Sequence, residues 1–253
     1  MGSMAMASTF MRRLEGKAAL ITGAASGIGE STVRLFSKHG AKVLIADIQD
    51  DLGEEVCKDL GQPSASFVHC DVTKESDVEG VVNTAITKYR KLDIMYSNAG
   101  IAGKLEPSIL DNEKSEFEKI ISVNLIGAFL GAKHAAGVMI PNRCGSIITT
   151  ASVCSNMGGV ASHAYTSSKH GVVGLVRNIG IRVNCMSPHL IATPLAKNLF
   201  KLNDKEYCYG MYSNLKVKGV VLKSEDVAEA ALFLAESKYV GGHSLLLMEA
   251  SPL

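Results

Sequence analysis

The stretch Ala19-Leu20-Ile21-Thr22-Gly23-Ala24-Ala25-Ser26-Gly27-Ile28-Gly29 is the part of the chain from which the fold is predicted. Its apolar start is typical of a buried strand, and Glu30 to His39, which follow the glycines, favour a helix. Glycines let the backbone turn tightly and approach a phosphate without an intervening side chain. The helix N-terminus adds unpaired N–H donors and a positive dipole end. The stretch therefore predicts a pyrophosphate site, although the spacing Gly23-x-x-x-Gly27-x-Gly29 by itself leaves an ordinary turn open.

The composition limits the class of protein. The chain has 253 residues, of which 47% are apolar and 20% charged, and this suits one α/β domain with a large core. The net charge of +1 gives no support for a nucleic-acid partner or a membrane surface. The apolar runs of the sequence are too short to predict a membrane span. Residues 1–12 lack the pattern of a secretory signal and are expected to form a disordered arm, which leaves 13–253 as the domain.

The six cysteines are Cys57, Cys70, Cys144, Cys154, Cys185 and Cys208. None forms a C-x-x-C pair, and no histidine stands at zinc-finger spacing from them, so the sequence predicts no metal site. Most of them lie among apolar residues, as reduced structural thiols of cytoplasmic proteins do. We therefore expect a cytoplasmic location.

Strand-like apolar runs alternate with helical patterns after the glycine stretch. The predicted strands are 41–47, 65–70, 92–96 and 145–150, and the predicted helices are 50–60, 74–90, 111–140 and 164–178. This alternation predicts an α/β fold with a doubly wound parallel sheet that carries helices on both faces. Ligands of such sheets bind beyond the carboxyl ends of the strands, where the glycine stretch, Asp47, Asp71 and Asn98 are expected to meet.

Asp47 ends the second predicted strand, where a dinucleotide fold carries its ribose-binding carboxylate. A carboxylate accepts hydrogen bonds from both hydroxyls of the adenosine ribose, and it repels a 2′-phosphate. No Lys or Arg stands in the glycine stretch or in the two positions after Asp47, so nothing nearby in the sequence neutralises such a phosphate. The sequence therefore predicts NAD rather than NADP; an ordinary strand-end carboxylate is the alternative.

A candidate catalytic pair follows the fifth predicted strand. Tyr165 and Lys169 are four residues apart and share one helix face. A cation near a phenol lowers its pKa from about 10 toward the range of a general base. Ser152 stands at the end of the preceding strand. Asn124 lies in an apolar stretch, where a buried amide needs hydrogen-bond partners, so we expect either a structural clamp or part of a polar network at the site.

These motifs resemble those of the short-chain dehydrogenase/reductase family, over roughly Leu14 to Leu247. The matching residues are Thr22-Gly23-x-x-x-Gly27-x-Gly29, Asp71-Val72, Asn98-Ala99-Gly100, Asn124, Ser152, Tyr165-x-x-x-Lys169 and Arg182-Val183-Asn184-x-x-x-Pro188. The resemblance implies a single Rossmann-type domain, a nicotinamide cofactor and a homo-oligomer, either a dimer or a tetramer.

The resemblance also implies roles for these residues. Tyr165 would be the general base, Ser152 would bind the substrate oxygen, and Lys169 would bind the nicotinamide ribose and lower the pKa of Tyr165. Asn124 would hold a water that connects Lys169 to bulk solvent. The residues expected to bind the cofactor are Gly23, Ser26, Gly27, Ile28, Gly29, Asp47, Asp71, Val72, Asn98, Ala99, Gly100, Tyr165, Lys169, Pro188, Ile191 and Thr193.

The chain is similar in particular to plant members of the family that oxidise hydrophobic secondary alcohols, namely borneol, secoisolariciresinol and xanthoxin dehydrogenases. Stretches 67–73, 158–165 and 187–195 carry this similarity. It implies NAD-dependent oxidation of a small apolar alcohol to a ketone, and we favour a cyclic monoterpenol such as borneol, which would give camphor. The alternatives are a lignan or xanthoxin as the substrate, a reductase that works in the opposite direction, and a non-catalytic dinucleotide-binding protein. The expected substrate-pocket residues are Ser152, Met157, His189, Leu190, Leu195, Leu199 and Met211.

Three segments depart from the family pattern. Arg177-Asn178-Ile179-Gly180 joins the catalytic helix to the next strand almost at once, where family members carry several more residues. The stretch 234–238 is also short, and Met248-Glu249-Ala250 replaces the usual Asp-Gly-Gly end. Residues 196–222, which include a polar and irregular part, are expected to form a lid over the substrate pocket.

Overall fold

The computed structural model describes residues 12–177, 182–200 and 222–248. Several expectations from the sequence fall largely outside these residues: the arm predicted over 1–12 up to residue 11, the join predicted over 177–180 from residue 178 onward, the lid predicted over 196–222 from 201 to 221, and the C-terminal end from 249 onward. Met211 and the side chain of Leu199 also lie outside the described part.

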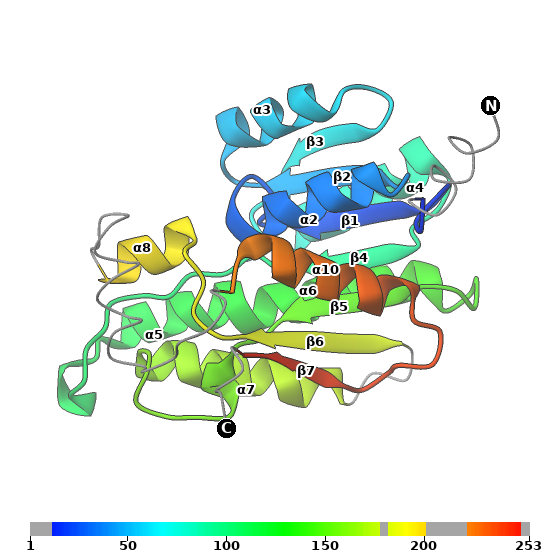
Figure 1. Cartoon of the computed structure of the whole chain (residues 1–253). Coiled ribbons are helices and arrows are strands. Elements are labelled where there is room, and N and C mark those ends of the chain that lie inside the picture. The colour runs from blue at the N-terminus through cyan, green and yellow to red at the C-terminus, as the bar shows by residue number, and fades with distance from the viewer. Residues whose placement is uncertain (1–11, 178–181, 201–221, 249–253) are drawn as a thin grey trace.

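A seven-stranded parallel sheet forms the centre of the molecule (Figure 1). Its strand order is β3-β2-β1-β4-β5-β6-β7, so the chain builds outward to one edge and then continues on the other side of β1. In the register, Ala19 of β1 lies between Val43 of β2 and Ile94 of β4. The strands are β1 (Ala18–Thr22), β2 (Lys42–Asp47), β3 (Ala65–His69), β4 (Ile94–Ser97), β5 (Ser146–Thr150), β6 (Val183–Pro188) and β7 (Ser244–Leu247). The predicted doubly wound sheet is confirmed.

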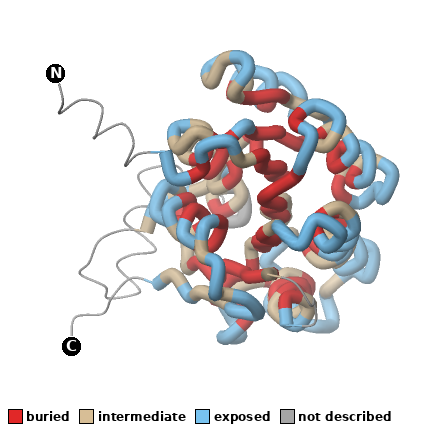
Figure 2. The backbone as a smooth tube through the Cα atoms, turned by 90° about the vertical axis from the view of Figure 1, so that its right-hand side faces the viewer, coloured by how far each residue is buried: buried red, intermediate tan, exposed pale blue. Residues whose placement is uncertain are grey.

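Helices cover both faces of the sheet. They are α2 (Gly27–Lys38), α3 (Asp50–Leu60), α4 (Glu75–Tyr89), α5 (Lys114–Ile121), α6 (Gly127–Met139), α7 (His163–Val176), α8 (Pro194–Phe200) and α10 (Ser224–Glu236). One face packs against α2, α3 and α10, and the other against α4, α6 and α7 (Figure 1). Along β1, Ala18 and Leu20 join the core under α4 and α6, while Ala19 and Ile21 join the core under α2 and α10. Figure 2 shows this buried centre within an exposed outer layer.

The helix predicted over 111–140 is interrupted. A π-helical turn, η2 (Ser122–Ile126), separates α5 from α6 and contains the buried Asn124. Such turns insert an extra residue into a helix and are frequent at functional sites. A side chain in this turn is thereby re-aimed relative to the rest of the helix, which matters for the position of Asn124 in the site.

The stretch Lys114–Met139 is long and apolar enough, by length and composition, to cross a membrane. The sequence argument that the apolar runs are too short is therefore not supported for this segment. A core helix meets the same criteria, and here α6 packs against β4, β5 and α4. This packing against the sheet and α4 accounts for the apolar composition of the segment.

We expect Gly131→Ala to destabilise the protein, because Gly131 lies where α6 touches β4. A Cβ atom there would lie 2.4 Å from Oγ of Ser97 and 2.8 Å from Cε of Met95, so these groups would have to shift. Overpacking of this kind costs about 1–3 kcal/mol. Gly137→Ala is the matched control, because it lies on the same helix with no atom within 4 Å of its Cβ position.

Thermal unfolding measures both variants. Gly137→Ala should equal or exceed the wild-type melting temperature, since alanine is the better helix former by about 1 kcal/mol. A Gly131→Ala protein as stable as its control would contradict the close α6–β4 packing.

Candidate active site

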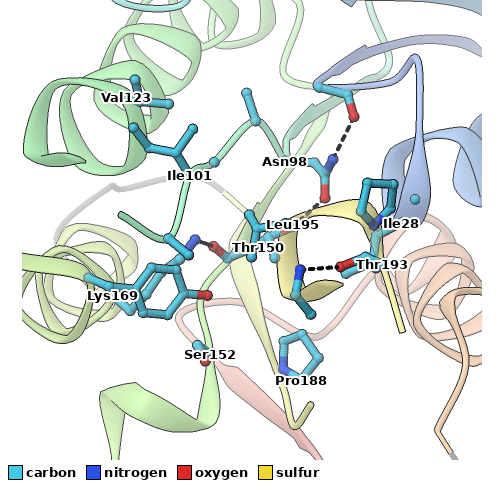
Figure 3. A pocket seen from close by; sticks show the side chains of 18 of the residues that line it. Ile28, Asn98, Ile101, Val123, Thr150, Ser152, Lys169, Pro188, Thr193 and Leu195 are labelled. Carbon is cyan, nitrogen blue, oxygen red and sulfur yellow. Dashed lines mark hydrogen bonds between the residues drawn. The ribbon is translucent and has the colours of Figure 1, made fainter. Parts of the chain in front are cut away.

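The carboxyl ends of the strands border a cavity of about 780 Å³. Its walls include the segments after β1 and β4, where the strand order turns around and where open α/β sheets bind ligands. Figure 3 shows Lys169 and Ser152 on one side of this cavity, with Ile28 and Thr193 on the other. The predicted cofactor-binding residues in its lining are Gly23, Ser26, Gly27, Ile28, Asp47, Asp71, Val72, Asn98, Ala99, Gly100, Tyr165, Lys169, Pro188, Ile191 and Thr193.

The glycine turn is fixed by close packing. Gly23 and Gly27 have positive φ angles of 61° and 58°, which residues with a side chain rarely adopt. A Cβ atom on Gly23 would lie 2.6 Å from Cα of Ala99, and one on Gly29 would lie 2.1 Å from the carbonyl oxygen of Gly23. Gly29 is not part of the lining. It lies in the first turn of α2, which starts at Gly27 and not at Glu30 as predicted. The N-terminus of the helix therefore borders the cavity. This cradle fits a dinucleotide pyrophosphate.

The side chain of Asn98 joins three strands at the edge of the cavity. Its Nδ2 donates to the carbonyl oxygens of Thr22 at 3.2 Å and Gly23 at 2.9 Å. Its Oδ1 accepts from the hydroxyls of Thr150 at 3.0 Å and Tyr96 at 3.3 Å. Asn98 therefore holds the glycine turn after β1 to the ends of β4 and β5 (Figure 3).

Asp47 is buried and already accepts hydrogen bonds from the protein. Its Oδ2 accepts from N–H of Ala25 at 2.9 Å, and its Oδ1 accepts from N–H of Gln49 at 3.0 Å and from Nε2 of Gln49 at 3.2 Å. A carboxylate has about four acceptor sites, so Asp47 both ties the glycine turn to β2 and keeps capacity for a ribose hydroxyl. Among the described lining residues, the lysines and arginines are Lys119 on α5 and Lys169 on α7, neither of them on the β2 side.

Asp71 and Val72 follow β3 at the same edge. The hydroxyl of Thr73 donates to Oδ1 of Asp71 at 2.7 Å and its N–H donates at 3.0 Å, and these bonds lower the pKa of Asp71. Val72 packs against Gly127 of α6, where an added Cβ would lie 2.9 Å from its Cγ2. The two residues form a charged and an apolar part of the cavity wall, next to Asp47.

Ser152, Tyr165 and Lys169 meet on the other side. The hydroxyl of Ser152 lies close enough to the phenol of Tyr165 to lower its pKa, and it accepts from N–H of Cys154 at 3.2 Å. Lys169 lies one turn after Tyr165 on α7. Its Nζ is 5.5 Å from the centre of the phenol ring and donates to the carbonyl oxygen of Thr150 at 2.6 Å. Three predicted catalytic side chains thus share one cavity.

Burial changes the acidity of this pair. Burial raises the pKa of Tyr165 to about 12, and the Ser152 hydroxyl acts in the opposite direction. Burial also lowers the pKa of Lys169 to about 8. Desolvation therefore decides the direction of the shift in the protein alone, and the lowering of the pKa of Tyr165 by Lys169 stays a prediction. Without a further positive charge, Tyr165 is a neutral phenol at neutral pH.

Asn124 lies behind the cavity wall and is 2% exposed. Its Oδ1 accepts from N–H of Ile101 at 2.8 Å, and its Nδ2 donates to the carbonyl oxygen of Ile101 at 2.9 Å and to Oγ of Ser168 at 3.0 Å. Asn124 is therefore a structural clamp for Ile101 and also part of a polar network through Ser168, which were its two predicted roles. It joins the segment after β4 to the catalytic helix, and its role in holding a water stays a prediction.

Four of the predicted substrate-pocket residues line the cavity, namely Ser152, His189, Leu190 and Leu195. Met157 is not in the lining, because it follows the short turn η3 (Val153–Ser155) toward the surface and is 43% exposed. Sequence reasoning missed further lining residues that belong to no motif, among them Ile101, Ala102, Lys119, Val123 and Thr150. For most of them the available signal is nearness in sequence to Gly100, Ser152 or Tyr165.

The described cysteines are free, namely Cys57, Cys70, Cys144, Cys154 and Cys185. Burial raises the pKa of Cys70 to about 12, so this thiol in the cavity wall stays protonated. Within residues 12–177, 182–200 and 222–248, no three His, Cys, Asp or Glu side chains gather into a group that could hold a metal ion.

Known proteins are similar to this chain in sequence and in fold. A family model described as enoyl-(acyl carrier protein) reductase matches residues 23–247. The mitochondrial borneol dehydrogenase of Lavandula x intermedia is 59% identical, over 96% of this chain and 93% of the relative. Secoisolariciresinol dehydrogenase of Forsythia intermedia is 53% identical, over 93% and 89%. The structure of a 3-ketoacyl-(acyl-carrier-protein) reductase from Brucella melitensis complexed with NADH matches with a TM-score of 0.82 and 32% identity, over 92% of this chain and 97% of that chain.

Burial of Lys169 predicts a pH dependence of stability. Its pKa is about 8 in the folded protein against an ordinary value of 10.5, so between these values the unfolded chain binds more protons. The free energy of unfolding contributed by Lys169 must then rise with pH across that window. Relative to Lys169→Met, which lacks the titrating group, the wild type should gain about 2 kcal/mol between pH 7.5 and 9.5.

Denaturant unfolding of both proteins at the two pH values measures this gain. A stability difference that stays constant, or that shrinks as the pH rises, would show that the ammonium of Lys169 is not desolvated in the folded protein.

Proposed function

The chain belongs to the short-chain dehydrogenase/reductase family, and we propose that it oxidises a hydrophobic secondary alcohol to a ketone with NAD. It is an oxidoreductase that acts on CH–OH groups with a dinucleotide cofactor. The observation that carries the proposal is the meeting of Ser152, Tyr165 and Lys169 in a cavity whose opposite wall is the glycine turn. A non-catalytic binding protein would have no use for this complete set.

Tyr165 moves the proton in the proposed mechanism. A bound nicotinamide dinucleotide supplies the hydride acceptor and, in its oxidised form, a positive charge. Ser152 donates a hydrogen bond to the alcohol oxygen and holds it beside the phenol. Tyr165 as phenolate takes the hydroxyl proton while the carbinol carbon loses its hydride, so that the C=O bond forms. Positive charge near Tyr165 lowers its pKa from about 12 toward the working pH.

Lys169 and Asn124 support this proton transfer. Nζ of Lys169 lies at the cavity wall, 3.7 Å from where a Cβ atom of Gly100 would stand, and we assign it to the nicotinamide ribose. Asn124 uses both amide hydrogens on Ile101 and Ser168, so the free acceptor capacity of its Oδ1 would hold the water that connects Lys169 to solvent.

Asp47 supports NAD as the cofactor. Its carboxylate borders the cavity at the end of β2, where it would meet an adenosine ribose. A 2′-phosphate there would face a buried negative charge that no described lysine or arginine of the lining offsets on that side. The resulting repulsion disfavours NADP.

We propose a cyclic monoterpenol such as borneol as the substrate. The lining residues around the catalytic set are largely apolar: Val153, Val160, Ala161, Leu190 and Leu195. Relatives named for borneol and for secoisolariciresinol are both more than half identical to this chain, so the lignan is an alternative substrate. Xanthoxin is an alternative on the sequence resemblance alone. A catalyst speeds both directions, and NAD preference favours the oxidation.

Location and assembly stay predictions. We propose a cytoplasmic protein, although the Lavandula relative is named as mitochondrial. We also propose a homo-oligomer, a dimer or tetramer, which sedimentation of the purified protein would test.

Initial rates of NADH formation with borneol test the proposal. We expect turnover with NAD, and a rate with NADP that is at least about tenfold lower, which corresponds to about 1.4 kcal/mol.

Asp47→Asn should narrow the ratio of the NAD rate to the NADP rate, because it removes the negative charge and keeps one side-chain acceptor. Equal rates with NADP would refute the Asp47 argument. Turnover of secoisolariciresinol or xanthoxin but not borneol would move the protein to the alternative substrate.

Tyr165→Phe should keep dinucleotide binding and lose turnover by about 10³-fold, since general bases contribute about 10²- to 10⁴-fold. Tyr239→Phe is the matched control, because Tyr239 is 98% exposed and should keep the wild-type rate. Fluorescence titration with NADH measures binding beside the kinetics. A Tyr165→Phe enzyme with normal turnover would exclude Tyr165 as the general base.

A further inference from the structure

Two buried serines hold the main chain of Tyr165. Oγ of Ser162, the residue that caps α7, accepts from N–H of Tyr165 at 3.2 Å. Oγ of Ser168 donates to the carbonyl oxygen of Tyr165 at 2.7 Å. Ser162 is 3% exposed and Ser168 is fully buried, so water does not readily replace either hydroxyl. The main chain of the predicted general base is thus fixed on both of its polar groups.

Both serines also reach the segment that follows β4. Oγ of Ser162 donates to the carbonyl oxygen of Ala102 at 3.1 Å. Oγ of Ser168 accepts from Asn124, which in turn binds the N–H and the carbonyl oxygen of Ile101. Because Ile101 and Ala102 are neighbours in the chain, these bonds close a circle. We call it the polar ring, and its members are Ile101, Ala102, Asn124, Ser162, Tyr165 and Ser168.

The polar ring connects two walls of the cavity. Tyr165 is in the lining on the side of α7, and Ile101 and Ala102 are in the lining after β4. The bond between Ser162 and Ala102 spans 60 residues of sequence, so it fixes α7 relative to a distant segment rather than within itself. A reacting group displaced by about 1 Å can cost 10²-fold in rate. The ring is therefore placed to control where the phenol stands.

We propose that Ser162 is a positioning residue for the reaction, which sets the place of the Tyr165 phenol through the polar ring. The inference rests on the proposed function of the site. The position requires a hydroxyl, because the group must accept from an N–H and donate to a carbonyl oxygen at the same time. Alanine does neither, and threonine does both.

Steady-state kinetics separate this role from simple helix capping. Ser162→Ala should lower kcat by about 10- to 100-fold and leave the KM for NAD within about twofold, at a temperature where the variant stays folded. Ser162→Thr should recover most of kcat. Ser167→Ala is the matched control, because Ser167 is exposed on the same helix, and its kcat should not change. An unchanged kcat in Ser162→Ala, with only the melting temperature lowered, would overturn the proposal.

A double-mutant cycle tests the ring as a unit. If Ser162 and Ser168 act through one ring, Ser162→Ala combined with Ser168→Ala should lower kcat little more than either change alone. Independent effects would multiply, and that result would overturn the proposal.

Amide hydrogen exchange tests the ring without any substrate. In Ser162→Ala, exchange at the N–H of Ile101 should quicken by at least about tenfold, although this group bonds to Asn124 and not to Ser162. Loss of a helix cap alone would quicken exchange in the first turn of α7 and leave Ile101 unchanged, which would overturn the proposal. If the wild type oxidises none of the alcohols, the proposed function fails, and this measurement still decides whether the ring exists.

Discussion

The hydrogen bonds of one half-buried amide, Asn98, are the constraint on which the site depends. The glycine turn and the catalytic residues come from different strands, and Asn98 bonds to the carbonyl oxygens of Thr22 and Gly23 on one side and to the hydroxyl of Thr150 on the other. The carbonyl oxygen of Thr150 in turn accepts a hydrogen bond from the ammonium of Lys169. The cradle for a pyrophosphate and the predicted catalytic lysine are therefore held to one shared residue at the end of β5.

The parallel sheet brings these groups together and also perturbs them. Because all seven strands run in one direction, each strand delivers its following segment to the same edge. The surrounding protein buries Tyr165 and Lys169 there, and desolvation disfavours the charged form of each group. This explains why the pKa of Tyr165 lies above, and that of Lys169 below, its ordinary value. In the proposed mechanism, the phenol becomes a base when further positive charge enters the cavity.

The same burial that perturbs the groups allows them to be held in place. Tyr165 contributes its N–H and carbonyl oxygen to bonds with Ser162 and Ser168, and both serines are shielded from water. In a largely apolar cavity, such buried bonds meet little competition from solvent. The lining provides few polar groups beyond Ser152, Tyr165 and His189 near the catalytic set, which suits recognition of an alcohol by one oxygen and an apolar body.

The sequence by itself determined the elements and the chemistry that depend on local order. Apolar periodicity, the glycine spacing and the position of Asp47 after β2 predicted the sheet, the turn and the acidic group, because each is a pattern within a few residues of one segment. The lining positions of Ser152, Tyr165 and Lys169 also followed from their motifs. Only the tertiary structure decided which distant groups meet: it placed Lys119 in the cavity wall and Met157 outside it, and it bonded Asn124 to Ile101 and Ser168. Burial within that structure also raised the pKa of Tyr165, which no local pattern predicts. Hydrogen-bond distances and desolvation depend on packing between segments far apart in the chain, and no pattern within a single segment contains them.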